Sequence, residues 1–241
     1  KSAQYGILPA CVGKPWPGKY TSAAEPEGYD YFHELINVDE GTRAGGGIAW
    51  AMMGGLGIGM PPVLNFGVPG DRALQDRVVR ECLAGEKIIC LCITEPGAGS
   101  DVANLACTAE DKGDHWLING QKIWTSYADK ADWIFALVRT DREAPKHKGI
   151  SFMLIDMSSP GVTTKPIKLI SGKSPFCETF FDDATTPKEH APGVSAIVGE
   201  MNKGWDVAKY LLTHEREMIS AGGGGLLGGR GMGRQGKNAS N

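Results

Sequence analysis

Two short segments of the chain combine residue types that suit the binding of an aromatic, phosphate-bearing ligand. The first runs from Leu91 to Asp101 and reads L-C-I-T-E-P-G-A-G-S-D. A strand would deliver Thr94 to a turn in which Gly97 and Gly99 can adopt backbone conformations closed to other residues. Such a turn can direct several backbone N–H groups at an anion, with the Ser100 hydroxyl as an additional donor. The segment therefore suits a pyrophosphate, although a purely structural turn would have the same composition.

The second segment runs from Lys122 to Ser126 and reads K-I-W-T-S. An indole beside hydroxyl groups can cover one face of a flat heterocycle while a hydroxyl bonds the edge of that ring. Taken alone, Trp124 at the end of a strand is equally compatible with a place in the hydrophobic core. The two segments together are more informative than either one.

Strands and turns between residues 88 and 200 must position these segments. Ile88 to Thr94 is an apolar run of strand length. The Asn119-Gly120 pair, between residues 115–118 and 121–124, predicts a hairpin with a type I′ turn. Further predicted strands are Trp133 to Arg139, Gly149 to Asp156, Val162 to Ile170 and Glu178 to Phe181. This many short strands within one stretch favours a small β-barrel or sandwich.

Helices are predicted on both sides of this β region. They are a short helix from Asp30 to Asp39, a glycine-dense buried helix from Arg43 to Pro61, an amphipathic helix from Asp71 to Ala84 and a helix from Gly204 to Glu217. The predicted fold class is therefore α + β. We expect an abbreviated N-terminal helical domain (1–87), a central β domain that binds the ligand (88–200) and the beginning of a C-terminal helical domain (201–241).

The glycine-rich tail contains a literal G-x-G-x-x-G at Gly223, Gly225 and Gly228. No predicted strand precedes it and no β-α-β unit surrounds it, so a dinucleotide fingerprint is not expected there.

Composition and charge narrow the classes of function. The chain has 241 residues, a net charge of −3 and no basic stripe, so nucleic acid is not an expected partner. No apolar run approaches the ~20 residues that cross a bilayer. The six cysteines form no C-x-x-C pair, which disfavours zinc and suggests buried free thiols. Cys90 and Cys92 would share one face of a strand. Free thiols indicate that the protein resides in a reducing compartment, which could be the bacterial cytoplasm, the mitochondrial matrix or the peroxisome.

From Cys92 to Ser126 the chain resembles the acyl-CoA dehydrogenase family, through C-I-T-E-P-G-A-G-S-D and W-L-I-N-G-Q-K-I-W-T-S. The similarity extends over about residues 67–220 and includes Phe180 to Asp183 and Gly204-Trp205. The resemblance implies an FAD-dependent oxidoreductase of fatty-acid β-oxidation. Such an enzyme desaturates the α,β bond of an acyl-CoA and passes electrons to an electron-transferring flavoprotein. It also implies a homo- or hetero-oligomer.

The resemblance further implies roles for individual residues. Thr94 would bond the edge of the flavin ring, and Ser100 would lie beside the pyrophosphate and also touch the acyl-CoA. Ser126 stands where many members have a threonine that reaches the N5 region of the flavin, and serine keeps that hydroxyl. The full set of implied FAD contacts is Leu91, Ile93, Thr94, Gly99, Ser100, Trp124, Thr125 and Ser126.

The catalytic base follows from the same resemblance. Most members carry the base, a glutamate, in a C-terminal helical domain, but isovaleryl and some long-chain types place it on the first helix after the barrel, before an arginine. Here Thr213-His214-Glu215-Arg216 occupies that place. Glu215 is the candidate base, and Thr213 and Arg216 are candidate substrate contacts. A solvated Glu-Arg pair on a helix surface is the alternative.

The ends of the chain leave three further possibilities open. The sequence begins on Lys1 and stops where the family's C-terminal helical bundle would continue. A fragment, one half of a split enzyme or a non-catalytic partner subunit would each have this form. A relative that performs another flavin oxidation, such as a nitroalkane oxidase, is a further alternative.

Overall fold

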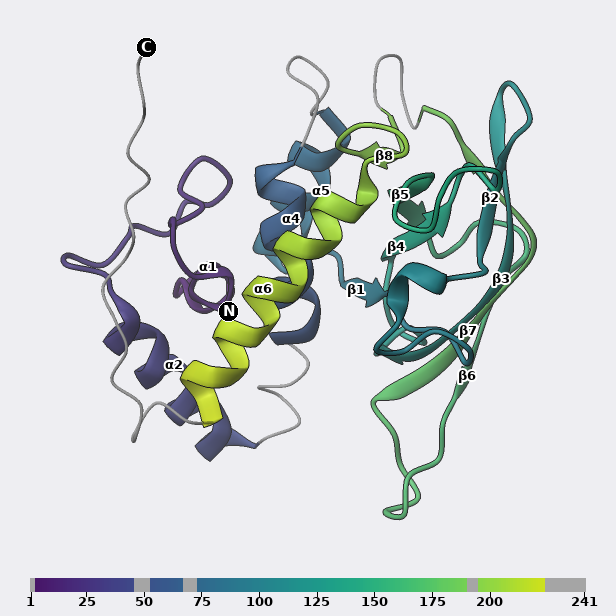
Figure 1. Cartoon of the computed structure of the whole chain (residues 1–241). Helices are drawn as coiled ribbons and strands as arrows, with labels where there is room; N and C mark the ends of the chain where they lie inside the picture. The colour runs from purple at the N-terminus through teal and green to yellow at the C-terminus, as the bar shows by residue number, and fades with distance from the viewer. Residues whose placement is uncertain (1–2, 46–52, 67–72, 190–194, 224–241) are drawn as a thin grey trace, which may run out of the picture.

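The computed structural model describes residues 3–45, 53–66, 73–189 and 195–223, in which helices precede and follow a β-sheet (Figure 1). This order confirms the α + β class. The first helical elements are α1 (Ile7–Val12), α2 (Tyr31–Ala44), the π-helix η1 (Met53–Gly59), α4 (Met60–Asn65) and α5 (Ala73–Ala84). After the sheet comes α6 (Gly204–Gly223). No helix in these described ranges is both long and apolar enough to cross a membrane.

Helix α2 begins at a side-chain cap that the sequence encodes locally. The Asp30 carboxylate accepts a hydrogen bond from the backbone N–H of Phe32 at 3.0 Å. In return, His33 Nδ1 accepts from the Asp30 backbone N–H at 3.2 Å, which completes a capping box. The helix continues to Ala44 and is therefore longer than the predicted segment, which ended at Asp39.

The predicted buried helix from Arg43 to Pro61 is not continuous. Helix α2 ends at Ala44, residues 46–52 lie outside the described ranges, and the remainder divides into η1 and α4. One of its glycines has a steric reason, because a Cβ atom on Gly55 would lie 1.9 Å from the carbonyl oxygen of Ile89. Glycine is therefore required where η1 crosses the first strand. Pro61, the predicted end of that helix, instead lies in the first turn of α4.

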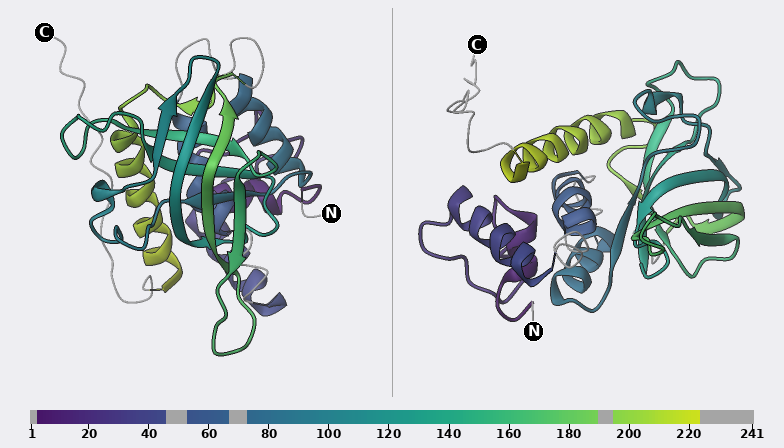
Figure 2. Two further views of the ribbon diagram at one scale, coloured as in Figure 1. Left: turned by 90° about the vertical axis from the view of Figure 1, so that its right-hand side faces the viewer. Right: turned by 90° about the horizontal axis from the view of Figure 1, so that it is seen from below.

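Eight strands within the described ranges form one sheet, seven of them in the order β6-β7-β3-β2-β4-β5-β8, with β1 paired in parallel to β4. Their bounds are β1 (Ile89–Cys92), β2 (Thr108–Asp111), β3 (His115–Ser126), β4 (Trp133–Arg139), β5 (Ile150–Asp156), β6 (Val162–Pro166), β7 (Phe176–Pro187) and β8 (Ile197–Val198). The sheet curls (Figure 2), so that Ile118 of β3 and Phe181 of β7 share one buried core with Ile134 of β4.

The predicted hairpin turn at Asn119-Gly120 is wrong. Strand β3 passes straight through both residues, and the actual turn, residues 112–114, joins β3 to β2, a strand that the sequence analysis did not predict. Asn119 instead exchanges two hydrogen bonds with Asp183, at 3.0 and 2.9 Å, where the pairing with β7 shifts register. Gly120 has φ 147°, and a Cβ there would lie 2.7 Å from Cys107 Cα. The Asn-Gly pair therefore lies at a shift of register between the long strands β3 and β7.

Two apolar cores lie on the two faces of β1. Ile89 packs toward the helices, whereas Cys90 and Cys92 face the inside of the curled sheet, which confirms the prediction that they share a face. All six cysteines are free and all except Cys11 are buried. Burial raises the pKa of Cys92 to about 11, so this thiol stays protonated near neutral pH.

Candidate active site

The glycine turn follows β1 and is closed by reciprocal backbone hydrogen bonds. Glu95 N donates to Ala98 O and Ala98 N to Glu95 O, both at 3.1 Å. Neither Gly97 nor Gly99 has a positive φ, so the turn does not use the glycine-only conformations that these two residues could adopt. The hydrogen bonds alone define this turn, and a Cβ on either glycine would have nothing within 4 Å. Glycine here leaves open space above the turn.

The second segment contains a β-bulge. Lys122 pairs with Thr179 of β7 and Thr125 pairs with Cys177, so two residues of β3 oppose one residue of β7. Trp124 takes up the extra length with φ 63°, a left-handed conformation that is uncommon for a bulky side chain.

The bulge decides which side chains reach the site. In a regular strand Ile123 and Trp124 would point to opposite faces. Here both line the same cavity, while Lys122 and Thr125 on either side are buried toward the inner core. Thr125 Oγ1 lies 3.6 Å from Cys92 Sγ and does not reach the cavity with its side chain. Ser126 then returns to the cavity face.

A cavity of about 530 Å³ lies between the sheet, η1 and α6, within the size range of small-molecule sites. It brings together every predicted FAD contact except Thr125 and adds the predicted base. Its lining residues are Gly54, Ile58, Leu91, Ile93, Thr94, Gly99, Ser100, Val102, Ile123, Trp124, Ser126, Phe176, Leu212, Glu215 and Arg216.

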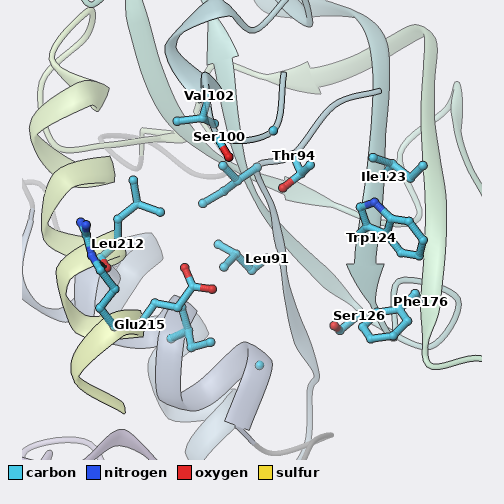
Figure 3. A pocket seen from close by; sticks show the side chains of 15 residues that line it. Leu91, Thr94, Ser100, Val102, Ile123, Trp124, Ser126, Phe176, Leu212 and Glu215 are labelled. Atoms are coloured by element: carbon cyan, nitrogen blue, oxygen red, sulfur yellow. Dashed lines mark hydrogen bonds between the residues drawn. The ribbon is translucent and has the colours of Figure 1, made fainter. Parts of the chain in front are cut away.

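Glu215 enters the cavity from α6. Leu212, Glu215 and Arg216 share one helix face because residues three and four apart lie above one another. Figure 3 shows the Glu215 carboxylate extending from the helix toward Leu91. Thr213 lies outside the cavity lining, is exposed, and donates its hydroxyl to the carbonyl of Lys209 at 2.9 Å.

The electrostatic surroundings of Glu215 suit a proton acceptor. Burial raises the pKa of its carboxyl above the usual value, and the positive charge of Arg216 opposes this with a smaller effect. Arg216 itself is exposed and donates its Nε to the carbonyl of Leu212 at 2.9 Å. A carboxylate whose pKa is moved toward neutrality is a better matched general base at physiological pH.

The opposite wall presents an aromatic ring and hydroxyl groups (Figure 3). Trp124 is 51% exposed although it lies in the site, and its ring meets Phe176 edge-on at 5.9 Å. The hydroxyls of Thr94, Ser100 and Ser126 line the same cavity. A flat heterocycle with a polar edge and a phosphate-bearing tail fits this donor set and the open space above Gly99.

Several residues of the site were missed from the sequence. Phe176 lies before the predicted strand from Glu178 to Phe181, and only the pairing of β7 with β3, in which it is opposite Ser126, brings it to the cavity. Gly54 carries no local signal, since only the packing of η1 on β1 brings it to the cavity. The buried pair of Lys122 and Glu95, whose atoms Nζ and Oε1 lie 2.9 Å apart, was also missed, although both residues belong to the quoted segments.

Known proteins are similar to this chain in both sequence and fold. Residues 90–184 match the family described as acyl-CoA dehydrogenase, middle domain. Acyl-CoA dehydrogenase FadE34 of Mycobacterium tuberculosis is 36% identical over 207 residues, which cover 86% of this chain and 27% of that protein.

Two solved structures share the fold. The glutaryl-CoA dehydrogenase complex with glutaryl-CoA has a TM-score of 0.76 and 31% identity, covering 92% of this chain and 53% of the other. The ChsE4-ChsE5 complex of Mycobacterium tuberculosis has a TM-score of 0.68 and 31% identity, covering 88% of this chain and 50% of the other. The chain thus spans about half or less of each of these three relatives. With its middle-domain match, its two motif segments and its fold, this chain belongs to the acyl-CoA dehydrogenase family.

Proposed function

We propose that the protein is an FAD-dependent acyl-CoA dehydrogenase in which Glu215 is the catalytic base. The observation that carries the proposal is the position of the Glu215 carboxylate, which extends from α6 into the cavity that Trp124 and Ser126 line from the sheet side. Partial burial and a raised pKa support the role of base. A solvated Glu-Arg pair on a helix surface is less compatible with a carboxylate that lines a cavity.

Each wall would hold a different part of the reactants. The turn that ends in Ser100 would bind the pyrophosphate, Thr94 the edge of the flavin ring and Trp124 one of its faces. FAD, when bound, would supply the acceptor for the β-hydride. Glu215 would remove the α-proton of the thioester. Ser100 and Arg216 remain candidate substrate contacts.

Two predicted contacts need a modified role. The Thr125 side chain lies on the far side of β3, so only its backbone can face the cofactor. The Thr213 hydroxyl is bonded to its own helix, so a contact with substrate would require that bond to break.

The direct test is a visible absorption spectrum of the purified chain reconstituted with FAD, recorded without oxygen and then with a panel of acyl-CoA thioesters. We expect flavin bands that bleach when a suitable acyl-CoA is added. A chain that binds FMN instead, binds no flavin, or binds FAD that no acyl-CoA reduces would contradict the proposal. The panel would also identify the acyl group.

For reoxidation we propose an electron-transferring flavoprotein, as the family resemblance implies, rather than oxygen. The measurement is the rate at which the reduced enzyme is reoxidised by each acceptor. Fast reoxidation by oxygen, together with turnover of a nitroalkane, would favour the alternative of a nitroalkane-oxidase type of reaction.

We further propose that the chain works in an oligomer with itself or with a second chain. Helix α2 exposes Tyr31, Phe32 and Ile36, which are 72%, 72% and 60% exposed. A cluster of large apolar side chains of this kind is typical of a protein contact. One structural relative is described as a complex of two proteins, ChsE4 and ChsE5. Light scattering of the purified protein, with mass analysis of any chain that co-purifies, tests the proposal; a lone monomer with full activity would contradict it.

A further inference from the structure

A buried lysine lies behind the sheet wall of the cavity. Lys122 is 0% exposed, and its ammonium group is 2.9 Å from Glu95 Oε1. The same group donates to the carbonyl of Ile93 at 3.0 Å and to that of Leu137 at 2.6 Å. Three acceptors thus satisfy the three donors of the ammonium. One side chain of the second segment thereby ties the first segment to β4.

The Glu95 carboxylate also accepts hydrogen bonds from two backbone N–H groups. Its carboxylate accepts from the backbone N–H of Ala106 at 2.6 Å and of Cys107 at 3.0 Å. Above the ion pair, Ile123 N donates to Thr94 O at 2.9 Å, which joins the two segments again at the cavity itself. The two segments, distant in sequence, are therefore connected through both side chains and backbone.

The ion pair lies immediately before the bulge. Lys122 is held inward on one side of Ile123 and Trp124, and Thr125 is held inward on the other side. Two residues must then fit opposite one residue of β7, which accounts for the left-handed φ of Trp124. A bulky residue persists in such a conformation only where its surroundings hold it. The inward anchor at Lys122 is one of those restraints.

We propose that Lys122 and Glu95 are positioning residues for the flavin. They hold Thr94 and Trp124 in one fixed arrangement, so that the hydroxyl and the indole meet the ring together. Neither side chain touches the cavity, and both act through the residues beside them. The inference rests on the proposed binding of FAD and extends it to residues outside the cavity lining.

The test separates positioning from general stability. Removing one member would leave a buried charge without its partner, which destabilises proteins strongly. The informative variant therefore combines Lys122→Met with Glu95→Gln, which removes both charges at similar side-chain size. The matched control combines Lys188→Met with Asp111→Asn, a Lys–Asp pair in the same sheet that is more exposed and outside the cavity. Far-ultraviolet circular dichroism and urea unfolding of the full chain establish that each variant is folded.

Two readouts follow on the folded variants: the FAD dissociation constant and the visible circular dichroism of the bound flavin, which reports its asymmetric surroundings. We expect at least tenfold weaker FAD binding and an altered visible spectrum for the double variant, and wild-type values for the control. Wild-type affinity and spectrum in the folded double variant would overturn the positioning role while leaving the proposed function intact. If the wild-type chain itself binds no FAD, the proposed function and this inference both fail.

If the double variant does not fold, the single variant Lys122→Arg takes its place. The guanidinium keeps a positive charge beside the Glu95 carboxylate, but its planar fork does not reproduce the bonds of the ammonium to the carbonyls of Ile93 and Leu137. A smaller change of both readouts in the same direction is expected. An unchanged flavin spectrum with unchanged affinity would again overturn the positioning role.

Discussion

The two walls of the cavity are built in different ways. The sheet wall is a network of directional bonds, with Lys122, Glu95 and the Ile123–Thr94 backbone bond fixing the two segments on one another. The helical wall consists of Gly54 and Ile58 on η1 and Leu212 and Glu215 on α6, which meet the sheet mainly through apolar packing. Hydrogen bonds fix distances within tenths of an ångström, whereas apolar contacts tolerate sliding. A cofactor cradle suits the first kind of wall, and an adaptable substrate pocket suits the second.

The largest difference between the two walls is expected from a variant of the helical wall that no longer reduces the flavin but still binds FAD. Glu215→Gln keeps the shape of the side chain and cannot accept a proton, so the rate of flavin reduction by acyl-CoA should fall about 10²–10⁴-fold. Affinity for FAD should be unchanged. Rapid mixing with acyl-CoA, followed at the flavin band, measures the rate. Lys209→Ala, at an exposed position of the same helix outside the cavity, is the control. Reduction at the wild-type rate would move the base to another segment or chain.

On the sheet wall, Ser100→Ala should weaken binding of FAD or of acyl-CoA by about 1.5–3 kcal/mol, the value of one hydrogen bond to a charged group. Calorimetric titration with each ligand measures the loss. Ser158→Ala removes an exposed hydroxyl bonded to Asp156 and should change neither affinity. If Ser100→Ala also changes neither, the turn is structural only.

Where the two walls touch, neighbouring glycines should behave differently. Gly55→Ala forces a Cβ against the Ile89 carbonyl and should lower the free energy of unfolding by about 1–3 kcal/mol. Gly54→Ala should stay near the wild-type value, because its Cβ would meet Ser126 Cβ at an ordinary 3.7 Å. Urea unfolding without ligand gives both values. Equal losses of unfolding free energy in the two variants would show that η1 and β1 are not in close contact at Gly55.

The smallest effect concerns the pH dependence of the base. Arg216 lowers the pKa of Glu215 against the larger opposing effect of burial. Glu215 must be deprotonated to act, so the rate of flavin reduction rises as pH increases through this pKa. Arg216→Gln removes the attraction and should displace the profile toward higher pH. Rapid-mixing rates across a pH series give the profile, and an unshifted midpoint would show that the charge of Arg216 does not reach the carboxylate.

Local pattern accounts for much of the molecule. The Asp30 cap, the amphipathic α5 and the apolar run of β1 are properties of a few neighbouring residues, so they can be predicted without a partner segment. The two motif segments can also be recognised without a partner segment, because together their residue types are typical of a ligand site. Glu215 was located through the resemblance, because a Glu-Arg pair alone is common on helix surfaces.

Tertiary structure decided the rest. Whether Asn119-Gly120 turns the chain or continues it depends on the pairing of β3 with β7, which lies far along the sequence. The same pairing creates the bulge that turns Trp124 into the cavity and Thr125 away from it. The alternation of side chains between the two faces of a strand can be read from the sequence only when every residue has a partner on the neighbouring strand. The sequence thus determined which residues could line a ligand site, and the register between distant strands determined which of them face the cavity.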